Sequence, residues 1–329
     1  MSDEEECSST FYSELIDEYP VVDLVYTWVD GSDRSWIKDY NTWKIRTNRK
    51  VNGSISSNRF RNCNELMYSI RSATKWANFF RKIFIVTDGQ VPKWLDLTKE
   101  GADERIEIIN HREIFPEPAD KYLPTFNSIA IEANLHRIPG LSEYFLYMND
   151  DVFFGNYVEI SDFISPSGKT YVFLQHPSKI VKPRIGYYMD DYNFRDALHN
   201  THLFLNTFVC YRKIRRTHNH VGYVMQKSIL QEIEDMLRDC NRWETTLTRF
   251  RENRNILTVS LLYPYYALDR GYAEEGHINT LNVSTDHKIY FDHIVESGYQ
   301  MFCLNGLKSN AERLWNRLVP NQSEFEKTH

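Results

Sequence analysis

The sequence predicts an α/β fold with a largely parallel sheet, flanking helices, and a helical and irregular second half packed on that sheet. Three observations predict it. Short apolar segments alternate with segments whose apolar residues recur at helical spacing. Acidic or glycine-containing turns follow several of the apolar segments, as is typical of the carboxyl ends of parallel strands. The chain has 329 residues, 42% of them hydrophobic, which is enough for a large core.

Four strands are expected in the first half, because the segments are short, apolar and rich in β-branched residues: residues 21–29, 82–87, 105–110 and 143–148. The apolar spacing predicts helices over residues 63–80 and 128–137. Residues 34–57 are polar and basic, which predicts a loop or lid. We expect the polar residues that follow the strands, from Asp30 to Asp151, to meet at one edge of the sheet.

The second half is less regular. We expect a strand over residues 171–175 and helices over residues 227–237 and 256–268, the last despite Pro264. Two further segments are expected as short strands that return to the sheet: residues 289–294 and 299–304. We divide the chain into an acidic, mobile lead-in, a single domain and a C-terminal tail: residues 1–19, 20–310 and 311–329.

The charge is unevenly distributed. The formal net charge is −6, but residues 34–82 carry twelve Lys and Arg against only Asp39 and Glu65, so this segment is +10 and the remainder −16. A local basic segment in an acidic protein favours a bound anion over general nucleic-acid binding. A solvated basic surface is the alternative interpretation.

Composition also excludes several classes of protein. The five cysteines are odd in number and lack CxxC spacing, which argues against a disulfide framework and against structural zinc. The mean hydropathy is −0.53, and the longest apolar runs are far shorter than the roughly 20 residues of a membrane helix. The N-terminus is acidic and does not resemble a secretory signal. We therefore expect a soluble, cytoplasmic protein.

Two adjacent carboxylates follow the fourth predicted strand, in the sequence Asn149-Asp150-Asp151. A cation or a proton relieves the repulsion between such neighbours, and oxygen-rich pairs of this kind hold Mg²⁺ or Mn²⁺ beside a diphosphate. The alternative is a turn whose side chains bond backbone amides. The residues alone leave both interpretations open.

Two other segments offer candidate ligand contacts. Residues 28–31, Trp-Val-Asp-Gly, would stack on and hydrogen-bond a nucleoside, or they form a tight turn that ends a strand. Arg59 and Arg61 precede a predicted helix, and guanidinium groups at a helix N-terminus make a phosphate site. Surface ion pairs are the alternative for the two arginines.

The second half contains two histidines at close spacing, His218 and His220. Such a pair is more often a loop coincidence than a zinc site, and acid–base chemistry or phosphate contact is the better functional interpretation. Arg249, Arg251 and Arg254 would add positive charge, or they form a charged helix end.

Taken in order, these segments resemble the Stealth family of sugar-phosphate transferases, which includes bacterial capsular polysaccharide phosphotransferases and the catalytic subunit of the lysosomal-targeting N-acetylglucosamine-1-phosphotransferase. The resemblance covers four blocks between about residues 21 and 306. The blocks are DLVYTWVDGSD (23–33); RFRNCNELMYSIRS (59–72) through RKIFIVTDGQVPKWL (81–95) to LPTFNSIAIEANLHRIPGLSEYFLYMNDDVFFG (123–155); HNHVGYVMQKSILQEI (218–233) with TRFRENRN and LLYPYYAL; and MFCLNG (301–306).

Three positions depart from the family's pattern. Gly222 stands where a proline is usual, Asn255 stands where an aspartate follows the RFR stretch, and Gly306 stands where the fourth block continues with aspartate. The last departure removes a carboxylate that this block would otherwise supply.

The resemblance implies a nucleotide-sugar transferase-like fold and the transfer of a sugar 1-phosphate from a nucleotide sugar, a UDP-sugar being favoured, to a glycan hydroxyl. It implies Mg²⁺ or Mn²⁺ at Asp150 and Asp151, one of which could instead take the acceptor proton, and His220 as acid, base or phosphate contact. Three arginines would offset phosphate charge: Arg61, Arg71 and Arg251.

The remaining implied contacts are with substrate. Six residues would line the nucleotide: Trp28, Asp30, Gly31, Asp88, Gly89 and Gln90. Three would hold the donor sugar and supporting hydrogen bonds: Asn127, Ser128 and Glu132. Four more are expected substrate contacts: Asn64, Glu65, Asn149 and Asn305.

Short length, few cysteines and the lack of a membrane anchor suggest the bacterial capsule or exopolysaccharide branch of the family. The enzyme would then work at the cytoplasmic face of the inner membrane, in peripheral contact with the capsule-assembly machinery. Its acceptor would be a polysaccharide, either free or lipid-linked. An ordinary glycosyltransferase and a non-catalytic relative that binds nucleotide sugar or glycan are the alternatives.

Overall fold

The fold comes from a computed structural model, which describes residues 19–48, 60, 62–99, 101–176, 194–209, 215–284, 291–305 and 311–327. The predicted lead-in therefore lies outside the described residues except for Tyr19. Arg59, Arg61 and Gly306 lie outside them as well.

Five strands form the central sheet, in the order β3-β2-β1-β4-β7: β1 (Val22–Thr27), β2 (Phe80–Thr87), β3 (Ile106–Asn110), β4 (Tyr144–Asn149) and β7 (Tyr223–Gln226). The first four are parallel, and β7 runs antiparallel beside β4. The order reverses at β1, so the carboxyl ends of β1 and β4 are neighbours, with Thr27 in register with Asn149. The predicted α/β fold with a mainly parallel sheet is confirmed.

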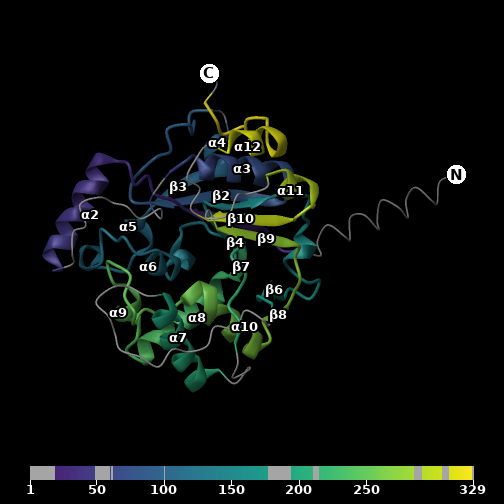
Figure 1. The fold of residues 1–329 in the computed structure, drawn as a ribbon. Helices are drawn as coiled ribbons and strands as arrows, with labels where there is room; N and C mark the ends of the chain where they lie inside the picture. The colour runs from purple at the N-terminus through teal and green to yellow at the C-terminus, as the bar shows by residue number, and fades with distance from the viewer. Residues whose placement is uncertain are drawn as a thin grey trace.

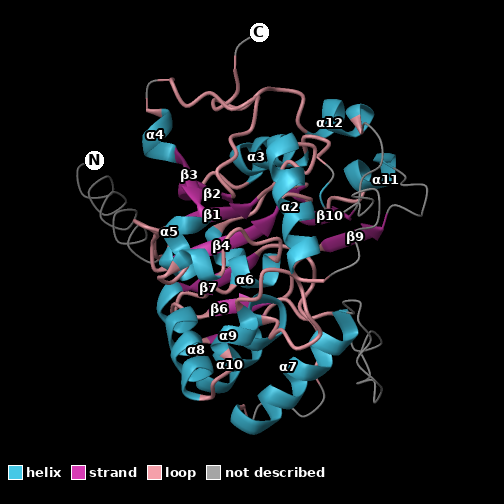
Figure 2. Ribbon diagram, turned by 90° about the vertical axis from the view of Figure 1, so that its left-hand side faces the viewer, coloured by secondary structure: helices cyan, strands magenta, loops and turns pink. Residues whose placement is uncertain are grey.

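Both faces of the sheet are covered, which Figures 1 and 2 show as helices above and below the strands. Leu24 and Tyr26 of β1 pack in the same cluster as Leu66 and Ile70 of helix α3 (Glu65–Trp76). Val25, between them, packs in the opposite cluster, which includes residues of helix α8 (Lys227–Asp239). β1 is therefore buried at every residue, which explains why it is apolar except for Thr27 and for Asp23, whose carboxylate accepts from Arg81.

The first half contains, besides α3, helices α2 (Arg34–Arg46), α4 (Ala102–Arg105), α5 (His111–Ile114) and α6 (Ser128–Glu132). The predicted loop or lid over residues 34–57 is wrong for residues 34–46, which form α2. Asp33 caps this helix by accepting a hydrogen bond from the Trp36 amide at 2.9 Å. Trp36 and Tyr40 bury one face of α2 against Phe60 and Phe126. Because many residues around these few aromatic side chains are charged, the sequence does not show the helical spacing of the buried face.

The second half adds further helices to the face on which α5 and α6 also pack: α7 (Phe194–Phe208), α8, α9 (Trp243–Thr246), a π-helical turn (Thr258–Leu262) and α10 (Tyr263–Arg270). Two short parallel strands, β6 (Thr170–Val172) and β8 (Ala273–Glu275), pair beside them. The predicted helices over residues 227–237 and 256–268 are confirmed. Pro264 lies near the start of α10, directly after the π-helical turn, and the Ser260 carbonyl four residues before it accepts from the His218 amide at 3.5 Å.

A separate three-stranded sheet is built from β5 (Val152–Phe154), β9 (Thr280–Ser284) and β10 (Met301–Asn305). The strand predicted over residues 299–304 is thus confirmed, but it joins this small sheet and not the central one. The strand predicted over residues 289–294 is wrong, because helix α11 (Phe291–Glu296) occupies the described part of that segment. β10 pairs with β5, which directly follows Asp151.

The C-terminal segment, predicted as a tail, packs onto the domain. Helix α12 (Glu312–Leu318) lies beside α3 in Figure 1, and Trp315 stacks on Tyr68 of α3 at 4.7 Å between ring centres. Beyond it, Phe325 and Glu326 are buried, and Glu326 forms an ion pair with Arg71 of α3.

Candidate active site at the carboxyl edge of the sheet

A cavity of about 520 Å³ opens at the carboxyl end of β4, between the central sheet, the small sheet and the second-half helices. Nine of the predicted site residues line it: Glu65, Ser128, Glu132, Asn149, Asp150, Asp151, His220, Arg251 and Asn305. They span the chain from α3 to β10. We refer to this space as the main cavity.

Three carboxyl groups line the main cavity: Glu65 at the start of α3, and Asp150 and Asp151 after β4. Burial, and then the charges of Asp151 and Glu65, raise the pKa of Asp150 well above its usual value. Burial is also the main cause of a raised pKa at Glu65, with a smaller contribution from Asp151. A buried carboxyl group beside two other carboxyl groups suits a bound cation, so the oxygen donors here fit Mg²⁺ or Mn²⁺.

His220 faces Asp151 across the floor of the cavity, with 3.6 Å between Nε2 and Oδ1. Burial lowers the pKa of His220, but the carboxylates of Asp151 and Glu132 outweigh it, so the net pKa is raised. Arg251 lies nearby and donates a hydrogen bond to the hydroxyl of Ser128. The site therefore places the imidazole of His220, the guanidinium of Arg251 and several carboxyl groups around one cavity.

Tyr147 of β4 connects several of these groups, and the sequence did not single it out. Its hydroxyl lies 3.0 Å from Thr27 Oγ1, accepts from Asn149 Nδ2 at 3.2 Å, and donates to Glu132 Oε1 at 3.4 Å. Tyr147 stands two residues before Asn149, on the same face of the strand, and this spacing is the signal that could have found it.

A smaller cavity of about 130 Å³ adjoins the main one. Four aromatic side chains line it: Trp28, Trp36, Phe60 and Phe126. It shares Ser128, Asn149, Asp150 and Arg251 with the main cavity. Trp28 is the one predicted nucleotide contact that lines it, so we refer to it as the aromatic cavity.

A third cavity, of about 520 Å³, lies on the far side of Trp28 at the ends of β1 and β2. The other predicted residues found at the sheet edge line this cavity: Asp30, Asn64, Asp88, Gly89 and Gln90. The Gln90 side chain accepts from the Asp30 amide at 2.8 Å and donates to the Asp30 carbonyl at 3.0 Å. Gln90 thus ties the β1 and β2 turns together.

Three predicted residues line none of these cavities. Arg71 points to the C-terminal segment, where Nε donates to Glu326 Oε1 at 2.7 Å and Nη2 donates to Oε2 at 2.5 Å. Gly31 is held against Phe60, because its amide donates to the Phe60 carbonyl at 3.0 Å. A Cβ at Gly31 would lie 2.2 Å from that carbonyl oxygen, so the close approach requires glycine.

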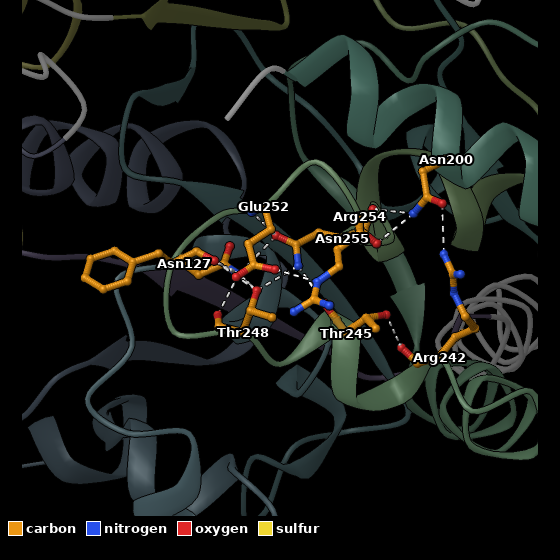
Figure 3. Close-up of polar contacts among 9 residues, drawn as sticks. Asn127, Asn200, Arg242, Thr245, Thr248, Glu252, Arg254 and Asn255 are labelled. Carbon is orange, nitrogen blue, oxygen red and sulfur yellow. Dashed lines mark hydrogen bonds and ion pairs between the residues drawn. The ribbon is translucent and has the colours of Figure 1, made fainter. Parts of the chain in front are cut away.

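Asn127, the third of these residues, is buried in a polar network (Figure 3). Its side chain donates to the Thr248 carbonyl at 2.8 Å and to Asn255 Oδ1 at 3.3 Å. Asn255 in turn donates to the Thr245 carbonyl at 2.6 Å and accepts from the Glu252 amide at 2.7 Å. The amide at position 255 is thus used both as donor and as acceptor. This network supports the Arg251 segment from behind the main cavity.

His218 is hydrogen-bonded within the fold, whereas His220 faces the main cavity. The backbone amide of Phe173 donates to His218 Nε2 at 3.1 Å, and His218 Nδ1 lies 2.7 Å from the Asn219 carbonyl. Burial lowers the pKa of His218 to about 4, so it is neutral and both ring nitrogens are used within the fold. His220 alone faces Asp151. Gly222 packs on Leu146 of β4, with 2.9 Å between an added Cβ and Leu146 Cδ1.

Comparison with known proteins shows two conserved regions and several similar proteins. Residues 20–46 match Stealth protein conserved region 1, and residues 59–172 match Stealth protein conserved region 2. Over 260 residues, 77% of the chain, it is 38% identical to an exopolysaccharide phosphotransferase of Streptomyces coelicolor, of which the match covers 41%. A second such protein of that organism is 33% identical over 307 residues, 89% of the chain and 48% of the relative.

A capsular polysaccharide phosphotransferase of Haemophilus influenzae is 43% identical over 153 residues, 46% of this chain and 40% of that protein. The chain thus spans less than half the length of these relatives. Carrying both conserved regions, it belongs to the Stealth proteins, as the sequence motifs predicted.

Within the described ranges, the structure has no helix that is both long enough and apolar enough to span a membrane. The predicted cellular location stays a prediction.

Proposed function

We propose that the protein is a phosphotransferase that moves a sugar 1-phosphate from a nucleotide sugar to a hydroxyl of a capsule- or exopolysaccharide-type glycan. The acceptor oxygen attacks the phosphorus that carries the sugar, a phosphodiester forms, and the bond to the departing nucleoside monophosphate breaks. The names of the relatives support the phosphotransfer and the polysaccharide acceptor. The donor class and the bond that breaks are our proposals.

The single observation that carries the proposal is the main cavity. It combines the carboxylates of Asp150 and Asp151, the His220–Asp151 pair at 3.6 Å and the guanidinium of Arg251 around one space. Phosphoryl transfer needs positive charge for the phosphate oxygens, an oriented nucleophile and a proton acceptor. With a divalent cation bound, this set of groups would provide the positive charge and the proton acceptor, and the acceptor hydroxyl is the nucleophile.

Asp150 and Asp151 would hold Mg²⁺ or Mn²⁺, and Glu65 lines the same cavity. The bound cation would neutralise charge on the diphosphate. Arg251, fixed by its hydrogen bond to Ser128, would contact the phosphoryl oxygens from another side.

We assign the acceptor proton to His220. Its neutral imidazole takes the proton from the acceptor hydroxyl, and the Asp151 carboxylate stabilises the imidazolium that forms. The raised pKa of His220 makes it a stronger base than an isolated histidine. Glu132, whose pKa is raised chiefly by burial, lies behind this pair and contacts Tyr147.

We place the nucleoside of the donor in the aromatic cavity. The rings of Trp28, Trp36 and Phe126 offer apolar surface for a base, and the cavity joins the main cavity at Asp150 and Arg251. A UDP-sugar remains the favoured donor.

The test is product analysis. Incubation with Mg²⁺, a UDP-sugar and a capsule oligosaccharide is expected to release UMP and to give a phosphodiester signal in ³¹P spectra. Asp151→Asn should lower turnover by orders of magnitude, whereas the exposed Asp120→Asn should not. Release of UDP would identify an ordinary glycosyltransferase, and tight donor binding without turnover on any acceptor would favour a binding protein.

A further inference from the structure

Three groups able to bind a metal converge on the floor of the main cavity: the Asp151 carboxylate, His220 Nε2 and the Cys303 thiol. One ligand atom from each lies within 4.8 Å of the other two. They come from separate elements, namely the turn after β4, the segment before β7, and β10. Backbone pairing holds two of them, because Cys303 is in register with Val152 and the Leu304 amide donates to the Asp151 carbonyl at 2.9 Å.

The spacing is that of metal ligands more than of a hydrogen bond. Asp151 Oδ1 and His220 Nε2 are 3.6 Å apart, which is longer than a hydrogen bond. Two ligand atoms on one tetrahedral ion, each at about 2.0–2.1 Å from the metal, lie about 3.4 Å apart. Asp151 Oδ1 is also buried with no hydrogen-bond partner among the described residues. The distance between Asp151 Oδ1 and His220 Nε2 is therefore close to that of two atoms bound to the same metal ion.

The donor types select the ion. Mg²⁺ binds oxygen ligands and takes neither thiolate nor imidazole readily, whereas Zn²⁺ and Co²⁺ accept sulfur, nitrogen and carboxylate oxygen together. We propose that Asp151, His220 and Cys303 form a binding site for a transition metal of the Zn²⁺ class, with the fourth position open to the main cavity. The site shares Asp151 with the proposed Mg²⁺ site and is otherwise separate from it.

Occupancy would inhibit the proposed reaction. The metal takes the Nε2 lone pair of His220, which then cannot accept a proton, and it draws Asp151 away from the magnesium ion. Inhibition rests on the proposed function, whereas metal binding rests only on the geometry of the three ligands. The two parts can therefore be tested apart.

Binding is tested by titrating the full chain with Co²⁺ and recording its absorption spectrum. One strongly bound ion per chain is expected to give the intense visible bands of four-coordinate Co²⁺ and a near-ultraviolet thiolate-to-cobalt band. Cys303→Ser should abolish the thiolate band, and the partly buried Cys240→Ser should leave it intact. His220→Gln, on the cavity wall, should weaken the visible bands and covers the case in which the buried cysteine variant does not fold.

Absence of the thiolate band in the folded wild-type chain would overturn the proposal. So would a band that survives Cys303→Ser, or one that is lost with Cys240→Ser.

Inhibition is measured separately, in assays with excess Mg²⁺ and added Zn²⁺. Zn²⁺ should abolish turnover of the wild-type enzyme and act at least tenfold more weakly on Cys303→Ser. Equal inhibition of both would refute the regulatory part. If no turnover is found with any donor, the proposed function fails while the Co²⁺ spectrum still decides the metal site.

Discussion

Arg71 and Arg251 were both expected at the donor phosphates, and the structure separates them. Arg71 forms a two-point ion pair with Glu326, whose side chain is 3% exposed. We therefore predict that Arg71→Ala destabilises the fold and leaves the donor KM unchanged. Arg251→Ala should instead lower turnover, with a small effect on stability.

The loss of stability expected for Arg71→Ala depends on the hydrogen bonds that Glu326 would keep. Removing one partner of a buried ion pair costs about 3–5 kcal/mol. Glu326 Oε1 would still accept from the Ser323 amide at 2.7 Å and from its hydroxyl at 3.0 Å, so we expect the lower limit, about 3 kcal/mol. With an unfolding entropy of about 2.1 cal/mol/K per residue, this lowers the Tm by about 4 °C.

The assay compares thermal unfolding and steady-state kinetics for the same variants. Loss of a phosphate-contacting guanidinium at Arg251 should reduce kcat by about 10²–10³-fold. Arg71→Lys keeps the charge without the two-point geometry and should fall between wild type and Arg71→Ala in Tm. An unchanged Tm together with a tenfold rise in donor KM for Arg71→Ala would refute this reasoning and restore the phosphate contact.

Three further results are expected. Asn255→Asp places a carboxylate against the carbonyl of Thr245 in a buried network. It should lower the free energy of unfolding, measured by urea titration, by about 2–4 kcal/mol. An unchanged free energy of unfolding would contradict the donor role of the Asn255 amide. Because the pKa of His220 is raised in the folded protein, its pairing with Asp151 stabilises the fold fully below the unfolded pKa of about 6.5, and less as the pH rises through the folded pKa. With a chelator present, His220→Gln should therefore lose more stability at acidic pH than at alkaline pH. A loss of stability that does not depend on pH would argue against the pair. Tyr147→Phe should lower kcat about tenfold or more with a nearly unchanged donor KM, since its hydroxyl positions neighbouring groups; a change in KM alone would indicate direct substrate contact.

Local sequence was enough for the strands of the parallel sheet. β1 and β4 lie between two covered faces, so their sequences are mostly apolar, and the polar residues that follow must lie at the carboxyl edge. Asp150 and Asp151 could be expected at the site for this reason. Helix α2 was missed, because its buried surface is confined to a few aromatic residues within a strongly basic segment.

The family, the parallel sheet and the acidic strand end were determined by the sequence itself, because buried strands and long motifs leave a local signature. Only the tertiary structure decided which arginine faces the cavity and which binds Glu326, since a guanidinium has the same sequence signature in either place. The same holds for Cys303, which meets Asp151 and His220 only because β10 pairs with β5. Such long-range pairings depend on packing between distant segments, and no local pattern records them.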